Sequence, residues 1–186
     1  MNHTLFEDEL IYLANIEPEK DAEIESKWSH DAKYLRMLSV EYACPLSAMQ
    51  IKKRYERIEK KADESGTLFY LTIRKREDDR LVGFICISVF DWSHRAASLQ
   101  LGLGDAADRG QGYGSRALKL MLRYAFGELN LRRISVKVPA YNTVALHIFE
   151  KAGFVVEVCR RQAIQRDGKC WDDMRLGLMQ EEWKSQ

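Results

Sequence analysis

Three glycines at alternate positions come just before the most regular helical segment of the chain. Gly110, Gly112 and Gly114 follow "AASLQLGLG", in which apolar residues recur at every second position, and lead into a segment whose apolar residues have helical spacing. Alternation with period two indicates a strand with one buried face, and spacings of three and four indicate one buried face of a helix. A strand, a glycine loop and a helix in this order present backbone N–H groups at the positive end of a helix dipole, where an anion binds readily.

The loop alone allows two interpretations, an anion-binding turn and a plain tight turn from a strand into a helix. Its sequence, "GQGYGS", lacks the G-x-G-x-x-G pattern of dinucleotide sites, and no G-K-[ST] follows it. It fits R/Q-x-x-G-x-G/A instead, starting at Arg109. In that pattern Arg109 can add a charge-assisted contact to an anion, and the Ser115 hydroxyl can add a further hydrogen bond.

The other apolar patterns predict an α/β fold with a mixed sheet, not the regular alternation of a Rossmann fold. Ser47 and Gln50 form an S-x-x-Q capping pattern that predicts a helix over residues 48–61, with Met49 on its outer side. Asn142 is expected to cap a later helix that ends at Gly153. The predicted strands are residues 9–14, a hairpin of "TLFYLTIRK" and "RLVGFICISVF", the strand before the glycine loop, "RRISVKVP", and a final pair, "FVVEVCRRQAI" and "WDDMRLGLM", joined at Asp167 and Gly168.

The composition argues against several classes of protein. The chain has 186 residues, enough for one domain with a core, and its formal net charge of +1 gives no reason to expect nucleic acid or a membrane as a partner. The N-terminal segment "MNHTLFEDEL" is acidic and has no long apolar run, so it predicts neither a signal peptide nor an anchor. Because no C-x-x-C spacing occurs, we expect reduced thiols, no metal site and a cytoplasmic location; the cysteines are Cys44, Cys86, Cys159 and Cys170.

The central half of the chain resembles the GNAT superfamily of acyl-CoA-dependent N-acetyltransferases over "LGLGDAADRGQGYGSRALKLMLRYAFGELNLRRISVKVPAYNTVALHIFEKAGFVVEV". The motifs "RGQGYGSRALKLMLRYAF", N-x-x-A-x-x-x-x-E-K-x-G-F and "RDGKCWDDMRLGLM" are most similar to the branch that contains ribosomal-protein N-terminal acetyltransferases and spermidine acetyltransferases. The resemblance covers roughly residues 68–183. It implies the GNAT fold, in which helices flank a twisted, mostly antiparallel sheet with one parallel, splayed strand pair. We therefore expect a single domain over residues 1–186, with a first strand and variable acceptor-side helices in residues 1–66 and the acyl-CoA-binding core and C-terminal strands in residues 67–186.

The resemblance also implies acetyl-CoA as the co-substrate and assigns residues to it. Backbone amides from Gln111 to Ser115 would cradle the pyrophosphate, with Arg109 at the start of the loop. The pantetheine arm would pair with the end of the preceding strand, and Asn142 would hydrogen-bond that arm while capping its helix. The cofactor-binding residues implied in this way are Leu103, Gly104, Arg109, Gly110, Gln111, Gly112, Tyr113, Gly114, Ser115, Asn142 and Phe149.

Amide formation from a thioester needs a neutral amine, stabilisation of an oxyanion and a proton for the departing thiolate. Many relatives carry a glutamate on the strand before the glycine loop, but "AASLQLGLG" has no acid. Candidate catalytic residues are therefore Asp91 and His94 in "DWSHR", although a histidine in a polar loop is more often simply solvated. Phe149 stands where many relatives have a tyrosine and is expected to pack against the pantetheine end, so Tyr141 is the candidate acid for the thiolate. Further acidic candidates are Asp105, Asp172 and Asp173.

Acceptor recognition is expected from the N-terminal helices, the "FDWSHRAAS" loop and the final strands, with Trp92 and Trp171 as lining residues or as partial core. The acidic stretch "EPEKDAEIES" could attract a polyamine or form a solvated helix face. The leading hypothesis is an acetyl-CoA-dependent N-acetyltransferase. Its acceptor would be a primary amine of a protein N-terminus or of a small molecule such as a polyamine, and the amine would attack directly in a ternary complex. The alternatives are a non-catalytic acyl-CoA-binding regulatory module and a structural domain, and the resemblance also allows a homodimer through the C-terminal strands.

Overall fold

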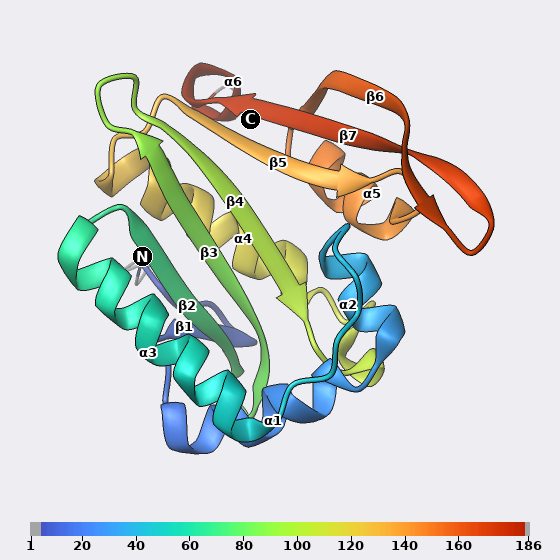
Figure 1. Ribbon diagram of the computed structural model, residues 1–186. Helices are drawn as coiled ribbons and strands as arrows, with labels where there is room; N and C mark the ends of the chain where they lie inside the picture. Colours follow the sequence, from blue (N-terminus) through green and yellow to red (C-terminus); the bar gives the residue numbers. More distant parts are fainter. Residues whose placement is uncertain (1–4, 185–186) are drawn as a thin grey trace.

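The computed structural model describes residues 5–184, which contain a seven-stranded sheet with the strand order β1-β2-β3-β4-β5-β7-β6 (Figure 1). All neighbouring strands are antiparallel except β4 and β5, which are parallel. The mostly antiparallel sheet with one parallel pair is therefore confirmed. The strands are β1 (Ile11–Ala14), β2 (Leu68–Lys75), β3 (Leu81–Asp91), β4 (Ala96–Leu103), β5 (Arg133–Pro139), β6 (Val155–Arg166) and β7 (Lys169–Met179).

Helices cover both faces of the sheet. We call the two sides the α4 face and the α3 face, after the helix that lies on each (Figure 1). The α4 face carries the main core, where alternate residues of the strands meet α4 and α5. The α3 face carries the N-terminal helices. No helix within residues 5–184 is both long enough and apolar enough to cross a bilayer. The helices are α1 (Pro18–Ser29), α2 (Ala32–Leu38), α3 (Ala48–Ser65), α4 (Tyr113–Arg123), α5 (Thr143–Lys151) and α6 (Gln180–Lys184), and a π-helical turn (Tyr124–Glu128) continues α4.

Local sequence signals set the helix ends. Ser47 and Gln50 form the predicted capping box at the start of α3, and Gly66 ends that helix in a left-handed conformation with φ 58°. Met49 is exposed, as expected, while Ile51 on another side of α3 is buried. Gly153 follows α5 with φ 93°, as predicted for the residue after a helix C-terminus.

The parallel strands β4 and β5 separate soon after they meet. Residues 96–98 pair with residues 133–135, and no further pair joins the two strands. From there β5 continues beside β7 as far as Pro139, whereas residues 99–103 of β4 have no strand on that side within the described chain. Figure 1 shows the two strands diverging toward the end of β4. We call this opening the splay; the glycine loop and the N-terminus of α4 follow directly from its β4 side.

Candidate functional site

The glycine loop presents unused backbone donors at the start of α4. Gly110 and Gly112 have φ angles of 76° and 84°, a left-handed conformation that glycine adopts without steric cost. Gly112 is the N-cap of α4 and provides no side chain to cap it. Among the described residues, no protein acceptor receives a hydrogen bond from the backbone N–H groups of residues 110–115. These donors lie at the positive end of the helix dipole, so the loop is built to receive an anion.

Ion pairs hold the start of this loop in place. The Arg80 guanidinium binds the buried Asp108 carboxylate through two hydrogen bonds of 2.8 and 2.5 Å. Arg109 Nη2 donates to the Gly104 carbonyl oxygen at 2.8 Å and lies 3.6 Å from Asp31 Oδ2 at the N-cap of α2. In this structure the Arg109 side chain therefore contacts protein atoms and fixes the loop to the end of β4.

Gly104 is needed for a packing contact that the sequence did not reveal. A Cβ atom built on Gly104 would lie 1.9 Å from Cδ2 of Trp28, so the indole ring lies directly against the Gly104 backbone. Trp28 belongs to α1 and is buried. The N-terminal helices thus pack on the end of β4 where the splay is open.

An apolar wall borders the splay on the α4 face. Leu101, Leu103 and Ile148 all approach Gly114, and their methyl carbons lie 3.6–3.9 Å from the position of a Cβ on that glycine. Leu101 and Leu103 are only partly buried, so they present apolar surface beside the unpaired strand edge. Phe149 is buried in the core, with its ring centroid 5.3 Å from that of Phe154.

Asn142 caps α5 on the far side of the splay, as predicted. Its Oδ1 accepts a hydrogen bond from the Ala145 backbone N–H at 3.1 Å. Its Nδ2 donates to the Met37 carbonyl oxygen at 2.9 Å, so the side chain also ties α5 to the end of α2. One Nδ2 hydrogen is left over after this contact.

Tyr141 makes a second connection to α2. Its hydroxyl donates to the Arg36 carbonyl oxygen at 2.8 Å and accepts a hydrogen bond of 3.2 Å from Arg166 Nη1. Burial raises the pKa of Tyr141 above its ordinary value, so the hydroxyl is protonated at neutral pH. The Trp171 ring meets the Tyr141 ring edge-on at 5.6 Å. The structure therefore brings Tyr141, Trp171 and Asn142 together at the β5 side of the splay.

A parallel strand pair that separates beside a glycine loop is the arrangement that the sequence resemblance implies. Residues 11–155 match the family model described as "Acetyltransferase (GNAT) domain". The chain belongs to the GNAT acetyltransferase family. Its curated relatives include the probable N-acetyltransferase YjcK of Bacillus subtilis, 33% identical over 128 residues that span 68% of this chain and 67% of that protein. They also include a spermidine N(1)-acetyltransferase of Vibrio cholerae, 27% identical over 103 residues that span 55% of this chain and 59% of that protein.

Solved structures share the GNAT fold over nearly the whole chain. A spermidine N-acetyltransferase from Vibrio cholerae, in complex with CoA and spermine, superposes with a TM-score of 0.80 at 20% identity, covering 94% of this chain and 98% of that one. A protein described as a probable acetyltransferase superposes with a TM-score of 0.81 at 22% identity, covering 95% of this chain and 96% of the other. At these identities the structures confirm the fold. The similarity to ribosomal-protein acetyltransferases stays a prediction.

Three residues that the sequence offered as catalytic or acceptor-lining candidates lie at the opposite end of β4 from the glycine loop. Asp91, Trp92 and His94 occupy the β3–β4 hairpin, and the whole of β4, about 25 Å of extended chain, separates them from the loop. The His94 side chain is 81% exposed, and its Nε2 lies 3.7 Å from Asp91 Oδ2. Trp92 packs edge-on against Phe69 at 6.5 Å. The structure does not bring these residues together with the loop.

The α3 face of the splay is polar and has no acid on β4. Ser98 and Gln100 are exposed on this face, and Gln100 Nε2 donates to the Leu38 carbonyl oxygen at 3.4 Å. The nearest buried carboxylate on the following strands is Asp173, which is 2% exposed and sits opposite Pro139 in the β5–β7 pair. Within residues 5–184 no donor reaches Asp173 Oδ1. This buried carboxylate was one of several acidic candidates in the sequence, and only the strand register places it on the α3 face.

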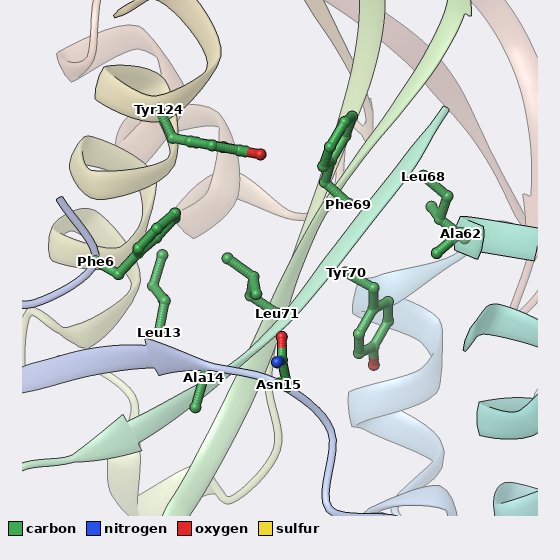
Figure 2. Close-up of a pocket in the computed structure, with 10 residues that line it drawn as sticks. All are labelled: Phe6, Leu13, Ala14, Asn15, Ala62, Leu68, Phe69, Tyr70, Leu71 and Tyr124. Carbon is green, nitrogen blue, oxygen red and sulfur yellow. The ribbon is translucent and has the colours of Figure 1, made fainter. Parts of the chain in front are cut away.

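A separate apolar cavity of about 480 Å³ lies at the edge of the sheet where β1 ends beside β2 (Figure 2). Figure 2 shows Phe6, Leu13 and Tyr124 facing Phe69 and Leu71 around it. None of its lining residues belongs to the glycine loop or the splay. The unused backbone donors of the loop, and not this cavity, therefore mark the candidate site of the GNAT domain. The lining residues are Phe6, Leu13, Ala14, Asn15, Ala62, Leu68, Phe69, Tyr70, Leu71 and Tyr124.

Proposed function

We propose that this GNAT protein is an acetyl-CoA-dependent N-acetyltransferase that transfers an acetyl group to a primary amine by direct attack in a ternary complex. One observation carries the proposal: within residues 5–184, the N–H groups of residues 110–115 lack acceptors at the N-terminus of α4, next to an edge of β4 that no described strand pairs with. Phosphate oxygens suit the first feature, and an extended polar chain suits the second. The CoA bound in the Vibrio cholerae structure of the same fold supports this assignment.

The residues around the splay fit the parts of acetyl-CoA. The loop amides would hold the pyrophosphate, and the free edge of residues 99–103 would pair with the amides of the pantetheine arm. Leu101, Leu103 and Ile148 would line that arm with apolar surface, and the remaining Nδ2 hydrogen of Asn142 could reach it. When bound, acetyl-CoA would supply the activated acetyl thioester.

The chain's own contribution to catalysis would be mainly positioning. An alkylamine has a pKa near 10.4, so only a small neutral fraction exists at pH 7. Because β4 carries no acid, Ser98 and Gln100 would orient the amine through neutral hydrogen bonds, while backbone N–H groups of the free β4 edge would stabilise charge on the acetyl oxygen. We therefore expect the rate to increase with pH up to the pKa of the amine.

The acceptor can be a protein N-terminus or a small amine. Relatives named spermidine N(1)-acetyltransferase favour a small amine, while the exposed Ser98 and Gln100 on the α3 face also suit a peptide. The absence of a β4 acid favours a second candidate, a non-catalytic acyl-CoA-binding regulatory module. An activity assay separates the two candidate functions, because the regulatory module would bind acetyl-CoA but acetylate no amine.

Thermal unfolding with and without acetyl-CoA tests the binding site. Acetyl-CoA at a hundred times its Kd should stabilise the protein by about 2.7 kcal/mol if it binds only the folded state. Gly112→Val places a β-branched residue at a φ of 84° and should abolish this shift. Gly127→Val is the matched control, because a Cβ at either glycine has no neighbour within 4 Å and Gly127 has no positive φ. No shift in the unaltered protein would refute the proposal, and a shift without thiol release on any amine would favour the regulatory module.

A further inference from the structure

Three cations share the α3 face of the sheet just beyond the splay. Lys137 on β5 and Arg175 on β7 stand directly opposite each other in the antiparallel register, so their side chains leave the same face. Arg160 on β6 stands opposite Asp173, two residues from Arg175 on that same face. The side chains of Lys137 and Arg160 are 45% and 56% exposed, and Arg175 is exposed too. We call Lys137, Arg160 and Arg175 the basic patch.

The basic patch has one counter-charge. Asp173 Oδ2 lies 3.5 Å from Lys137 Nζ and 3.6 Å from Arg160 Nη1, both longer than a good charge-assisted hydrogen bond. The Arg175 side chain has no hydrogen-bond or ion-pair partner among residues 5–184. The other nearby acids are already engaged: Glu157 pairs with Arg133, and Asp172 accepts from the Gln162 backbone N–H. Three cations therefore surround a single carboxylate.

Like charges directly opposite in a sheet are destabilising, and Asp173 supplies only one negative charge to the three cations, so a further anion would stabilise the Lys137–Arg175 pair. Arginine and lysine side chains with free donors bind carboxylate or phosphate oxygens, and arginine does so in a bidentate manner. The backbone amides of the glycine loop lie at the N-terminus of α4, which packs on the opposite face of the sheet. A coenzyme whose pyrophosphate bound those amides would therefore leave the basic patch without an anion.

The position of the basic patch places it beside the acceptor path. Lys137 is two residues beyond Ser135, the last residue of β5 that pairs with β4, so it lies about 7 Å along the strand from the point where the splay opens. We infer that the acceptor is an amine that also carries an anionic group, a carboxylate or a phosphate, which the basic patch binds. This inference rests on the proposed function. The amine end then lies at the splay, several bonds from the anionic end.

The acidic stretch of α1 does not offer a competing site for a polyamine. Asp21 is buried and accepts two hydrogen bonds from Arg74 Nη2, at 2.7 and 2.9 Å. Glu25 is buried against Arg54 and Tyr55. Glu17 and Glu19 are paired with Lys20 and Lys52. Among the described residues of this stretch, only the exposed Glu23 has no such partner, so the stretch offers a polycation one free carboxylate, whereas the basic patch offers an anion three exposed cations.

The experiment compares acceptors that differ only in their second group. Purified protein with acetyl-CoA is assayed by thiol release on 5-aminopentanoate, 4-aminobutyl phosphate and (5-aminopentyl)trimethylammonium, and on the tripeptide amides Ser-Asp-Gly and Ser-Arg-Gly, each of which carries one primary amine. We expect kcat/KM to be at least tenfold higher for the anionic member of each set, and the first two acceptors distinguish a carboxylate from a phosphate. Lys137→Glu leaves two cations beside two carboxylates and should remove the preference, and so should Lys137→Gln combined with Arg175→Gln, which leaves Arg160 beside Asp173.

Lys61→Gln provides the matched control, because it removes the same charge from an exposed position of α3 and should leave the preference unchanged. The stabilisation by acetyl-CoA should be the same in all these variants, which shows that each is folded with its cofactor site intact. Equal or higher kcat/KM for the cationic acceptors, or a preference that survives Lys137→Glu, would overturn this inference alone. No acetylation of any acceptor would overturn the proposed function and this inference with it.

Discussion

The two sides of the splay are built in different ways. On the cofactor side, the donors are backbone N–H groups of residues 110–115, and their orientation comes from two glycines with positive φ and the start of a helix. On the proposed acceptor side, the groups that would recognise the acceptor are side chains, among them Gln100, Lys137 and Arg175, carried by three different strands. A backbone site of this kind needs few particular side chains beyond its glycines, so it can stay constant while the acceptor side changes.

This difference has an energetic consequence. Loop amides that are held by local geometry keep their positions when distant side chains change, since their conformation depends on neighbouring residues. Side chains on separate strands keep their positions only if the strand register and the packing of the N-terminal helices are intact. Substitutions on the proposed acceptor side should therefore alter acceptor preference. Only substitutions at contacts that join the two sides should affect the binding of both acetyl-CoA and the amine.

Trp28 is such a spanning contact, and its removal should have the largest effect. Trp28→Ala removes a buried indole that packs on Gly104 at the end of β4, so the free energy of unfolding should fall by about 3–5 kcal/mol. Because α1 and α2 would lose the contact that packs them on the end of β4, KM should rise both for acetyl-CoA and for the amine. Chemical denaturation and steady-state kinetics measure the two effects.

Trp28→Phe keeps an aromatic ring at the same place and serves as the control. It should recover much of the stability and both KM values. If Trp28→Ala raised only the KM of the amine, the contact would belong to the acceptor side alone, and the two sides would be more independent than we expect.

The features that the sequence predicted are those set by neighbouring residues. The glycine loop, the capping box at Ser47 and the Asn142 cap each depend on a few adjacent positions, and all three form as expected. The period-two pattern of β4 likewise predicted which of its residues enter the core. Such patterns report local conformation, so they identify the backbone-built cofactor side.

The features that the sequence did not reveal depend on contacts between distant segments. The insertion of β7 between β5 and β6 puts Lys137 opposite Arg175, and no local pattern specifies that strand order. The packing of Trp28 on Gly104 also joins segments far apart in the chain. The π-helical turn after α4 was missed as well, because its apolar spacing is that of an ordinary helix. The acceptor side is built mostly from contacts of this type.

Tyr141→Phe sharpens the comparison on the acceptor side, with an intermediate effect. The substitution removes the hydroxyl that donates to the Arg36 carbonyl and accepts from Arg166, which should lower the free energy of unfolding by about 1 kcal/mol. If Tyr141 serves only to hold α2, KM for the amine should rise a few-fold and kcat should stay nearly constant. A loss of kcat of a hundredfold or more would instead assign the thiolate acid to Tyr141. Steady-state kinetics over a range of amine concentrations separates these outcomes, with Tyr42→Phe at an exposed position as the control.

Asp8→Asn should have the smallest effect and should be confined to the cofactor side, since Asp8 holds α4 through a 2.9 Å ion pair with Arg116. Partial burial raises the pKa of Asp8, but the hydrogen bonds from Arg116 and from two backbone N–H groups outweigh it, so the pKa lies below its ordinary value. A carboxyl group with a lowered pKa stabilises the fold fully above its unfolded pKa, near 3.9, and loses this contribution as the pH falls toward its folded pKa. The difference in unfolding free energy between the unaltered protein and Asp8→Asn should therefore be constant from pH 7 to 5, at no more than about 1 kcal/mol, and should shrink below pH 4. Denaturant titrations at several pH values measure this difference. Arg116→Gln removes the other partner of the ion pair, so its free energy of unfolding at pH 7 should be close to that of Asp8→Asn. A difference that persists undiminished at pH 3 would show that the Asn side chain disturbs the backbone hydrogen bonds of Asp8, and that the ion pair contributes little to holding α4.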